Sequence, residues 1–149
     1  MDFYIFGKNQ SMADNFSVQI NIPVADHIYK YLLAKCGTLP YIASRSHFIG
    51  SVVLSTLNRN EDIRHYSKKK FTKHFNVIIK EESYLRNGIY LDYKCAKAFR
   101  DLIDSMFREE LYNHVILNRL HHGTKYIECI RNFLKVYDIT EEDIKEETV

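Results

Sequence analysis

The sequence predicts a predominantly helical α+β protein with about three short strands and five helices. Apolar and polar residues alternate in a few short stretches, whereas apolar residues recur every three or four positions in longer ones. Of the 149 residues, 46% are apolar and 13% aromatic, which is enough for a core. With only two prolines and five glycines, the chain does not have the composition of a disordered or linker-rich protein.

The first predicted strand covers residues 16–22, where apolar side chains alternate with Ser17, Gln19 and Asn21. Alternation of this kind gives a strand one apolar and one polar face. Pro23 follows, and proline suits the end of a strand or the first turn of a helix.

Two helices are predicted next, separated by a six-residue connector. Residues 24–36 have helical apolar spacing, and Gly37 suits the position after a helix end. Ser44 or Ser46 can cap a second helix that ends near Leu57.

A basic connector over residues 58–74 divides the chain. After it, residues 75–80 and 89–93 are predicted as two strands, and Asn87-Gly88 between them favours a hairpin. The resulting segments, 1–57, 58–74 and 75–149, form either separate units or one shared core.

Helices account for the rest of the chain. A long one is predicted over about 94–120 and ends at His121-His122-Gly123, and another runs from Thr124 to about Tyr137. Thr140 then opens a short acidic helix with a pattern similar to a capping box.

Charge is divided unevenly along the chain. Residues 1–80 carry 11 Lys and Arg against 5 Asp and Glu, whereas residues 81–149 carry 10 against 14. A basic first part predicts a face offered to an anion, and ordinary scatter of surface charge is the alternative.

Several classes of protein do not fit the sequence. It has no run of 18 uncharged apolar residues, so no membrane span is expected, and its start lacks the pattern of a signal peptide. The three cysteines are odd in number and not closely spaced, which favours a reducing, cytoplasmic location. We expect no cofactor, metal or small-molecule ligand.

The order of strand, Pro23, helix, Gly37 and serine-capped helix over residues 16–57 resembles that of ribbon-helix-helix DNA-binding proteins. The resemblance covers about 42 of the 149 residues. It implies a homodimer in which strands of two chains form a ribbon in the major groove of duplex DNA. The connector between the helices is longer than is usual in that family, and the strand has no outward Arg or Lys.

The resemblance also implies roles for particular residues. Ser17, Gln19 and Asn21 would meet base edges, because side-chain amides can bond bidentately to adenine. The residues Ser44, Arg45 and Ser46 would hold a phosphate at the start of the second helix. The alternative is a strand within an intramolecular sheet, with its polar side chains facing water.

The basic connector is a second candidate for binding nucleic acid. Its cations Lys68, Lys69, Lys70 and Lys73 could neutralise phosphates without reading sequence. A solvated connector is the simpler interpretation of such a charge run.

No catalytic motif, metal-ligand spacing or phosphate-binding glycine loop is present, so we expect no enzyme. The leading hypothesis is a DNA-binding regulator of transcription or accessory factor, of a type that suits a phage or mobile element. A protein–protein interaction module with no role in nucleic-acid binding is the alternative.

Overall fold

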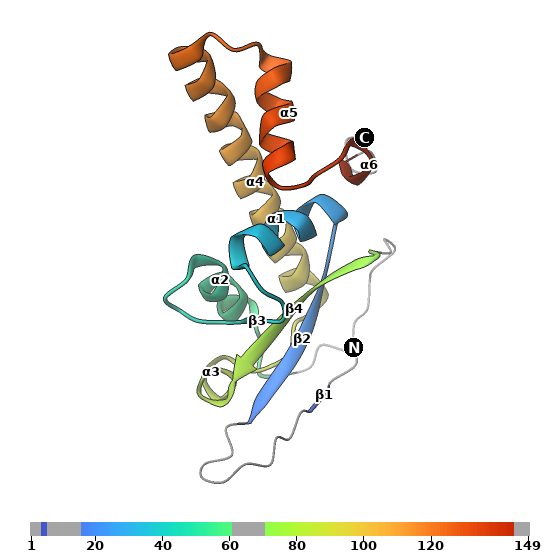
Figure 1. Ribbon diagram of the computed structural model, residues 1–149. Helices are drawn as coiled ribbons and strands as arrows, with labels where there is room; N and C mark the ends of the chain where they lie inside the picture. Colours follow the sequence, from blue (N-terminus) through green and yellow to red (C-terminus); the bar gives the residue numbers. More distant parts are fainter. Residues whose placement is uncertain (1–3, 6–15, 61–70, 145–149) are drawn as a thin grey trace.

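The computed structural model describes residues 4–5, 16–60 and 71–144, which form one four-stranded sheet and six helices (Figure 1). This confirms the predicted α+β class. The elements follow one another as β1 (Tyr4–Ile5), β2 (Ser17–Val24), α1 (Asp26–Cys36), β3 (Tyr41–Ile42), α2 (Phe48–Thr56), β4 (Lys73–Lys80), α3 (Glu81–Asn87), α4 (Tyr93–His122), α5 (Tyr126–Val136) and α6 (Glu141–Ile144).

The sheet has the strand order β1-β2-β4-β3. Its long central pair is antiparallel: β2 and β4 run side by side from Ser17 opposite Lys80 to Val24 opposite Lys73. The flanking strands are only two residues long, with β1 antiparallel to β2 and β3 parallel to β4. The β2 strand therefore lies between two strands of its own chain.

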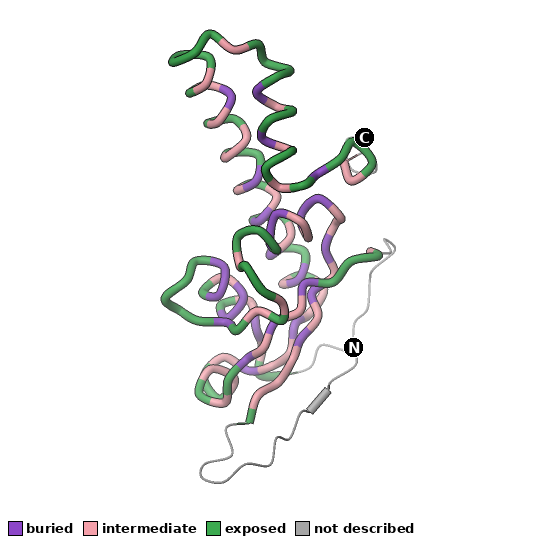
Figure 2. Tube along the Cα trace, in the orientation of Figure 1, coloured by how far each residue is buried: buried purple, intermediate pink, exposed green. Residues whose placement is uncertain are grey.

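Helices cover one face of this sheet. Every second residue of β2 and β4 is buried there against α1, α2 and α4 (Figures 1 and 2). The buried strand residues are Ile20, Ile22, Val24, Phe75, Val77 and Ile79. A single hydrophobic cluster extends from Ile20 to Ile139, so residues of the segments 16–57 and 75–144 share one core.

The hairpin predicted over residues 75–93 is wrong. Residues Glu81–Asn87 form α3 instead, and Gly88 ends that helix with φ of +86°. In place of a third long strand, Tyr90 makes an isolated bridge with Asn58. The side chain of Asp92 then caps α4 by accepting a hydrogen bond from the Cys95 N–H at 2.7 Å.

The longest helix, α4, extends well beyond the sheet. Its first half packs on the sheet, while its second half forms an antiparallel pair with α5 that projects from the body (Figure 1). The predicted end at His122 is confirmed, because Gly123 adopts the left-handed conformation and donates to the Arg119 carbonyl.

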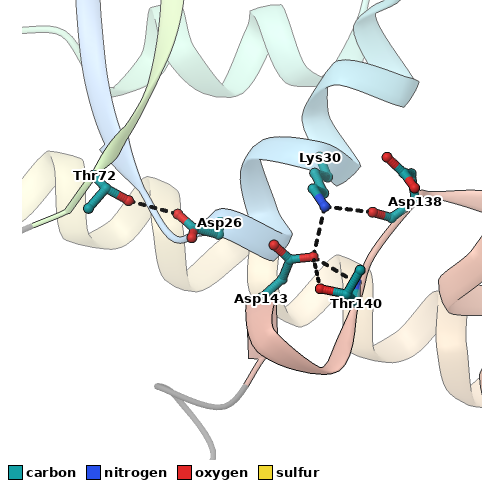
Figure 3. Close-up of polar contacts among 6 residues, drawn as sticks. All are labelled: Asp26, Lys30, Thr72, Asp138, Thr140 and Asp143. Carbon is teal, nitrogen blue, oxygen red and sulfur yellow. Dashed lines mark hydrogen bonds and ion pairs between the residues drawn. The ribbon is translucent and has the colours of Figure 1, made fainter.

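After α5 the chain returns to α1 (Figure 3). Lys30 of α1 donates to the Asp138 carbonyl at 2.7 Å and to the Asp143 carboxylate at 2.8 Å. The same carboxylate accepts from the backbone and hydroxyl of Thr140, and Asp26 accepts from Thr72. These contacts fix the first half of α1 to more distant parts of the chain.

A second set of polar side chains joins α1 to α4. The Glu110 carboxylate accepts from the Tyr31 hydroxyl at 2.7 Å and from Lys35 at 2.5 Å. Burial opposes the charged form of Glu110, but the bonds from Lys35 and Tyr31 outweigh it and lower the pKa of the carboxyl. Burial likewise opposes ionisation of Asp143, and its bonds from Lys30 and Thr140 lower its pKa.

These two carboxylates predict a loss of stability in acid. Both pKa values are lower in the folded chain, so each group stabilises the fold above its ordinary pKa, 4.5 for Glu110 and 3.8 for Asp143. That stabilisation disappears as pH falls through the lowered values. Because Glu110 is partly exposed, we expect Glu110→Gln to cost only about 0.5–1 kcal/mol at pH 7. Urea unfolding between neutral pH and pH 3 should show the variant and wild type converging in acid; a constant difference would contradict this.

Candidate nucleic-acid interface

The candidate interface is the face of the β2–β4 ladder that α1, α2 and α4 do not cover. Ser17, Gln19 and Asn21 lie on this face, half-buried, as the predicted alternation requires. Gln19 Nε2 donates to Asn21 Oδ1 at 3.3 Å, which holds the two amides side by side. The predicted base-reading residues therefore share one surface.

The opposite strand contributes to the same face. In an antiparallel pair, directly opposed residues project to the same side. Asn76 therefore lies beside Asn21, Ile78 beside Gln19, and Lys80 beside Ser17. Because Asn76 and Lys80 are more than 50 residues away from β2 in sequence, local spacing could not reveal this grouping.

The four strands contain no Asp or Glu. The β4 strand instead begins and ends with exposed lysines, Lys73 and Lys80. Lys73 lies 5.6 Å from the centre of the Tyr29 ring, and His74 beside it is also exposed. The uncovered face thus combines hydrogen-bonding amides with Lys80 at one end. At the other end Lys73 alternates with buried Phe75 and projects to the helix side, whereas His74 projects to the uncovered side.

The pairing of β2 differs from that in a two-chain ribbon. One side of β2 is paired with β4 over its whole length and the other side with β1. The long connector between the two helices of residues 16–57 contains β3, which joins the sheet beside β4. The intramolecular alternative for this strand is therefore the arrangement that the structure shows.

The serines expected to cap the second helix do not do so. Helix α2 begins at Phe48, after His47, and no side chain caps that position. Ser44 Oγ instead accepts from the Ser46 N–H at 3.3 Å and lies 2.8 Å from Ser46 Oγ, so the two serines bond within their own turn. Both remain exposed beside Arg45.

Arg45 and Arg59 both reach the carboxyl end of α3, where Arg86 lies, and we call these three residues the arginine cluster. Arg45 donates to the Asn87 side chain at 3.0 Å, and Arg59 donates to the Arg86 carbonyl at 2.9 Å. Both contacts lie at the carboxyl end of α3, which follows β4 directly.

No carboxylate within residues 16–60 and 71–144 pairs with the arginine cluster. Glu81 and Glu82 at the start of α3 reduce the net charge of this region. No sequence signal groups Arg59 or the end of α3 at Arg86 with Arg45, because the fold alone brings Arg45 and Arg59 to this helix end.

Lys68, Lys69 and Lys70 lie outside the described residues. Lys73, predicted as part of the same connector, is instead the first residue of β4.

Cys36 and Cys95 are not activated as nucleophiles. Burial raises the pKa of the Cys36 thiol to about 11. Burial is also the main reason for the raised pKa of Cys95, which is aided by the nearby Asp92. Both groups therefore remain protonated thiols near neutral pH.

Among the described residues, no three His, Cys, Asp or Glu side chains come together as a metal site. Nor does any helix in this part of the chain combine the length and apolar character needed to cross a membrane.

Comparison of the chain with protein-family models, with curated proteins and with solved structures finds no match.

Proposed function

We propose that the protein is a non-enzymatic DNA-binding protein, a regulator or accessory factor, that presents the uncovered face of β2 and β4 to the major groove. The observation that carries this proposal is the grouping of Gln19, Asn21 and Asn76 on one face of strands that contain no carboxylate. The major groove, about 12 Å wide, admits a two-stranded β-ribbon. The long β2–β4 pair, flanked only by two-residue strands, has that form within a single chain.

In the proposal, residues of the uncovered face contact bases, and residues at its ends and beyond it contact phosphates. The amides of Gln19, Asn21 and Asn76 bond to base edges, and Ile78 offers apolar contact to thymine methyl groups. Lys80 on this face neutralises a phosphate, and Lys73, which projects to the helix side at the opposite end of β4, reaches a phosphate beyond the edge of the face. At the Lys80 end of the face, the exposed Ser44–Ser46 turn and the arginine cluster extend the contact to the DNA sugar–phosphate backbone. Lys68, Lys69 and Lys70 add attraction to phosphates that does not depend on the DNA sequence.

Reversing the two strand-end charges should weaken binding to all duplexes. We expect the double variant Lys73→Glu/Lys80→Glu to lose roughly 10- to 100-fold in affinity at low salt, with a shallower salt dependence, because phosphate contacts are lost. Fluorescence anisotropy with a labelled duplex of mixed sequence, titrated over a series of salt concentrations, measures both quantities.

The matched control is Lys125→Glu/Arg131→Glu, which makes the same change in charge on exposed residues of the projecting α4–α5 pair. If only total charge matters, both double variants lose affinity equally, and the proposed face is wrong. Absence of salt-dependent binding by the wild-type chain at low salt would overturn the DNA-binding proposal itself and favour a protein-interaction module.

A further inference from the structure

The two strands of the β2–β4 ladder present different side chains to the uncovered face. From one end of the ladder to the other, the directly opposed residues on this face are Ser17 and Lys80, Gln19 and Ile78, Asn21 and Asn76, and Pro23 and His74. Only the third of these pairs joins identical residues. A ribbon made by the same strand of two copies would instead repeat every residue about a two-fold axis. The face therefore has a direction, which a two-chain ribbon does not have.

Strand β3 makes one side of this face apolar. Ile42 of β3 lies opposite Ile78 of β4, and directly opposed residues of neighbouring strands project to the same side of a sheet. Tyr41 stacks on buried Phe75 with ring centres 5.9 Å apart, so Tyr41 projects to the helix side and Ile42, which is 50% exposed, to the uncovered side. One row across the sheet thus consists of Gln19 on β2, Ile78 on β4 and Ile42 on β3. We call it the Gln19 row.

The Gln19 row matches the major-groove edge of an A·T base pair. Adenine offers the N7 acceptor and the N6 amino donor on one side of the groove, and thymine offers its methyl group on the other. The Gln19 amide can bond both adenine groups, while Ile78 and Ile42 can contact the methyl group. The bond from Gln19 to Asn21 uses one of the two N–H groups of the Gln19 amide, so the second N–H and the carbonyl oxygen can face the base.

The dimensions of the face agree with this match. Neighbouring strands lie about 4.8 Å apart, so the Gln19 row spans about 9.6 Å from β2 to β3, within the groove width of about 12 Å. Along β2, successive residues on the uncovered face are about 6.7 Å apart and together cover about 20 Å, the length of about six base pairs. Six base pairs are little more than half a helical turn, over which the major groove can face one protein.

We infer that a single chain reads a non-palindromic site of about six base pairs, in which the Gln19 row fixes the orientation of one A·T pair. This inference rests on the proposed function and adds the class of duplex that the face selects. In the opposite orientation, Gln19 would meet the thymine methyl group and the two isoleucines would meet the polar edge of adenine, which leaves polar groups unbonded. Because β2 already lies between β4 and β1, the ribbon is complete without a strand from a second copy.

Modified bases test the Gln19 row without knowledge of a target site. Anisotropy titrations compare a duplex of mixed sequence with the same duplex in which uracil replaces every thymine, which removes only the methyl groups. A third duplex carries 7-deazaadenine in place of adenine, which removes only N7. We expect each change to weaken binding of the wild-type chain by about threefold to tenfold, because each removes one of the two contacts to an A·T pair.

Two variants assign these effects to their side chains. Ile42→Ser should lose the difference between thymine and uracil and keep the effect of 7-deazaadenine, whereas Gln19→Ala should do the reverse. Ile127→Ser on α5 is the matched control for Ile42→Ser, because Ile127 is 51% exposed and α5 projects away from the sheet (Figure 1), and it should respond as wild type does. Urea unfolding checks that the variants are folded. Equal binding of thymine and uracil duplexes by the wild-type chain would overturn the inference, as would equal behaviour of Ile42→Ser and Ile127→Ser.

Selection of duplexes from a random-sequence library, followed by sedimentation of the selected complex, tests the non-palindromic site. We expect an asymmetric site that holds one 17.7-kDa chain. A palindromic site holding two chains would overturn the inference and leave DNA binding intact, as would salt-dependent binding with no enriched sequence. Absence of binding to every duplex would instead overturn the proposed function, and the inference with it.

Discussion

Gly88→Ala is expected to destabilise the fold by about 3–5 kcal/mol, enough to unfold a marginally stable domain. Gly88 has φ of +86°, a conformation that costs an L-residue about 1 kcal/mol or more. An added Cβ would also lie 2.0 Å from the Asn58 carbonyl oxygen and 2.3 Å from its carbon. Because these are backbone atoms, relieving the clash means separating the two segments.

The separation would break a junction on which the core depends. Asn58 and Tyr90 exchange two backbone hydrogen bonds across this point, of 2.7 and 3.0 Å. The Asn58 side chain also donates to Asp92, the residue that caps α4. Moving Gly88 away from Asn58 therefore disturbs the start of the longest helix.

Gly37→Ala provides the control for Gly88→Ala. Gly37 also has positive φ, +79°, but an added Cβ would have no atom within 4 Å. The Gly37→Ala substitution should therefore lower the free energy of unfolding by only about 1 kcal/mol, the cost of the positive φ alone. Urea unfolding of both variants separates steric from conformational cost, and equal losses would show that the close approach to Asn58 is not tight.

The difference between prediction and structure at Asn87-Gly88 has a physical cause. An Asn-Gly pair favours positive φ, and both a hairpin turn and a helix end use that conformation. The choice between them depends on Asn58, about 30 residues earlier, which fills the space against Gly88 and pairs with Tyr90. Local signals are sufficient at Gly37 and Gly123, because each of these helix ends is formed within its own last turn.

For the candidate interface too, local spacing was predictable from the sequence and long-range pairing was not. Alternation along β2 was sufficient to place Ser17, Gln19 and Asn21 on one face. The partner strand was not predictable from β2, since register depends on which apolar faces pack together. Asn76 and Lys80 joined the interface only through that register.

Because adjacent residues of β4 lie on its two faces, substituting one should affect folding stability and substituting the next should affect DNA binding. Phe75 is fully buried and stacks between Tyr41 and Phe99, with ring centres 5.9 and 6.1 Å away. Phe75→Ala should therefore cost about 3–5 kcal/mol of folding stability, because it leaves a cavity between α4 and the sheet. Asn76, the next residue, lies on the uncovered face beside Asn21.

Asn76→Ala should leave the free energy of unfolding within about 1 kcal/mol of wild type. In the proposed function it should instead reduce discrimination between DNA sequences by about 1–3 kcal/mol, the contribution of one good amide contact to a base. Urea unfolding and anisotropy titrations against several duplexes measure the two quantities on the same proteins. If Asn76→Ala weakens all duplexes equally or not at all, the amides do not read bases, and the uncovered face binds by charge alone or not at all. If Asn76→Ala is as destabilising as Phe75→Ala, the face is part of the core, and no surface remains there to bind DNA.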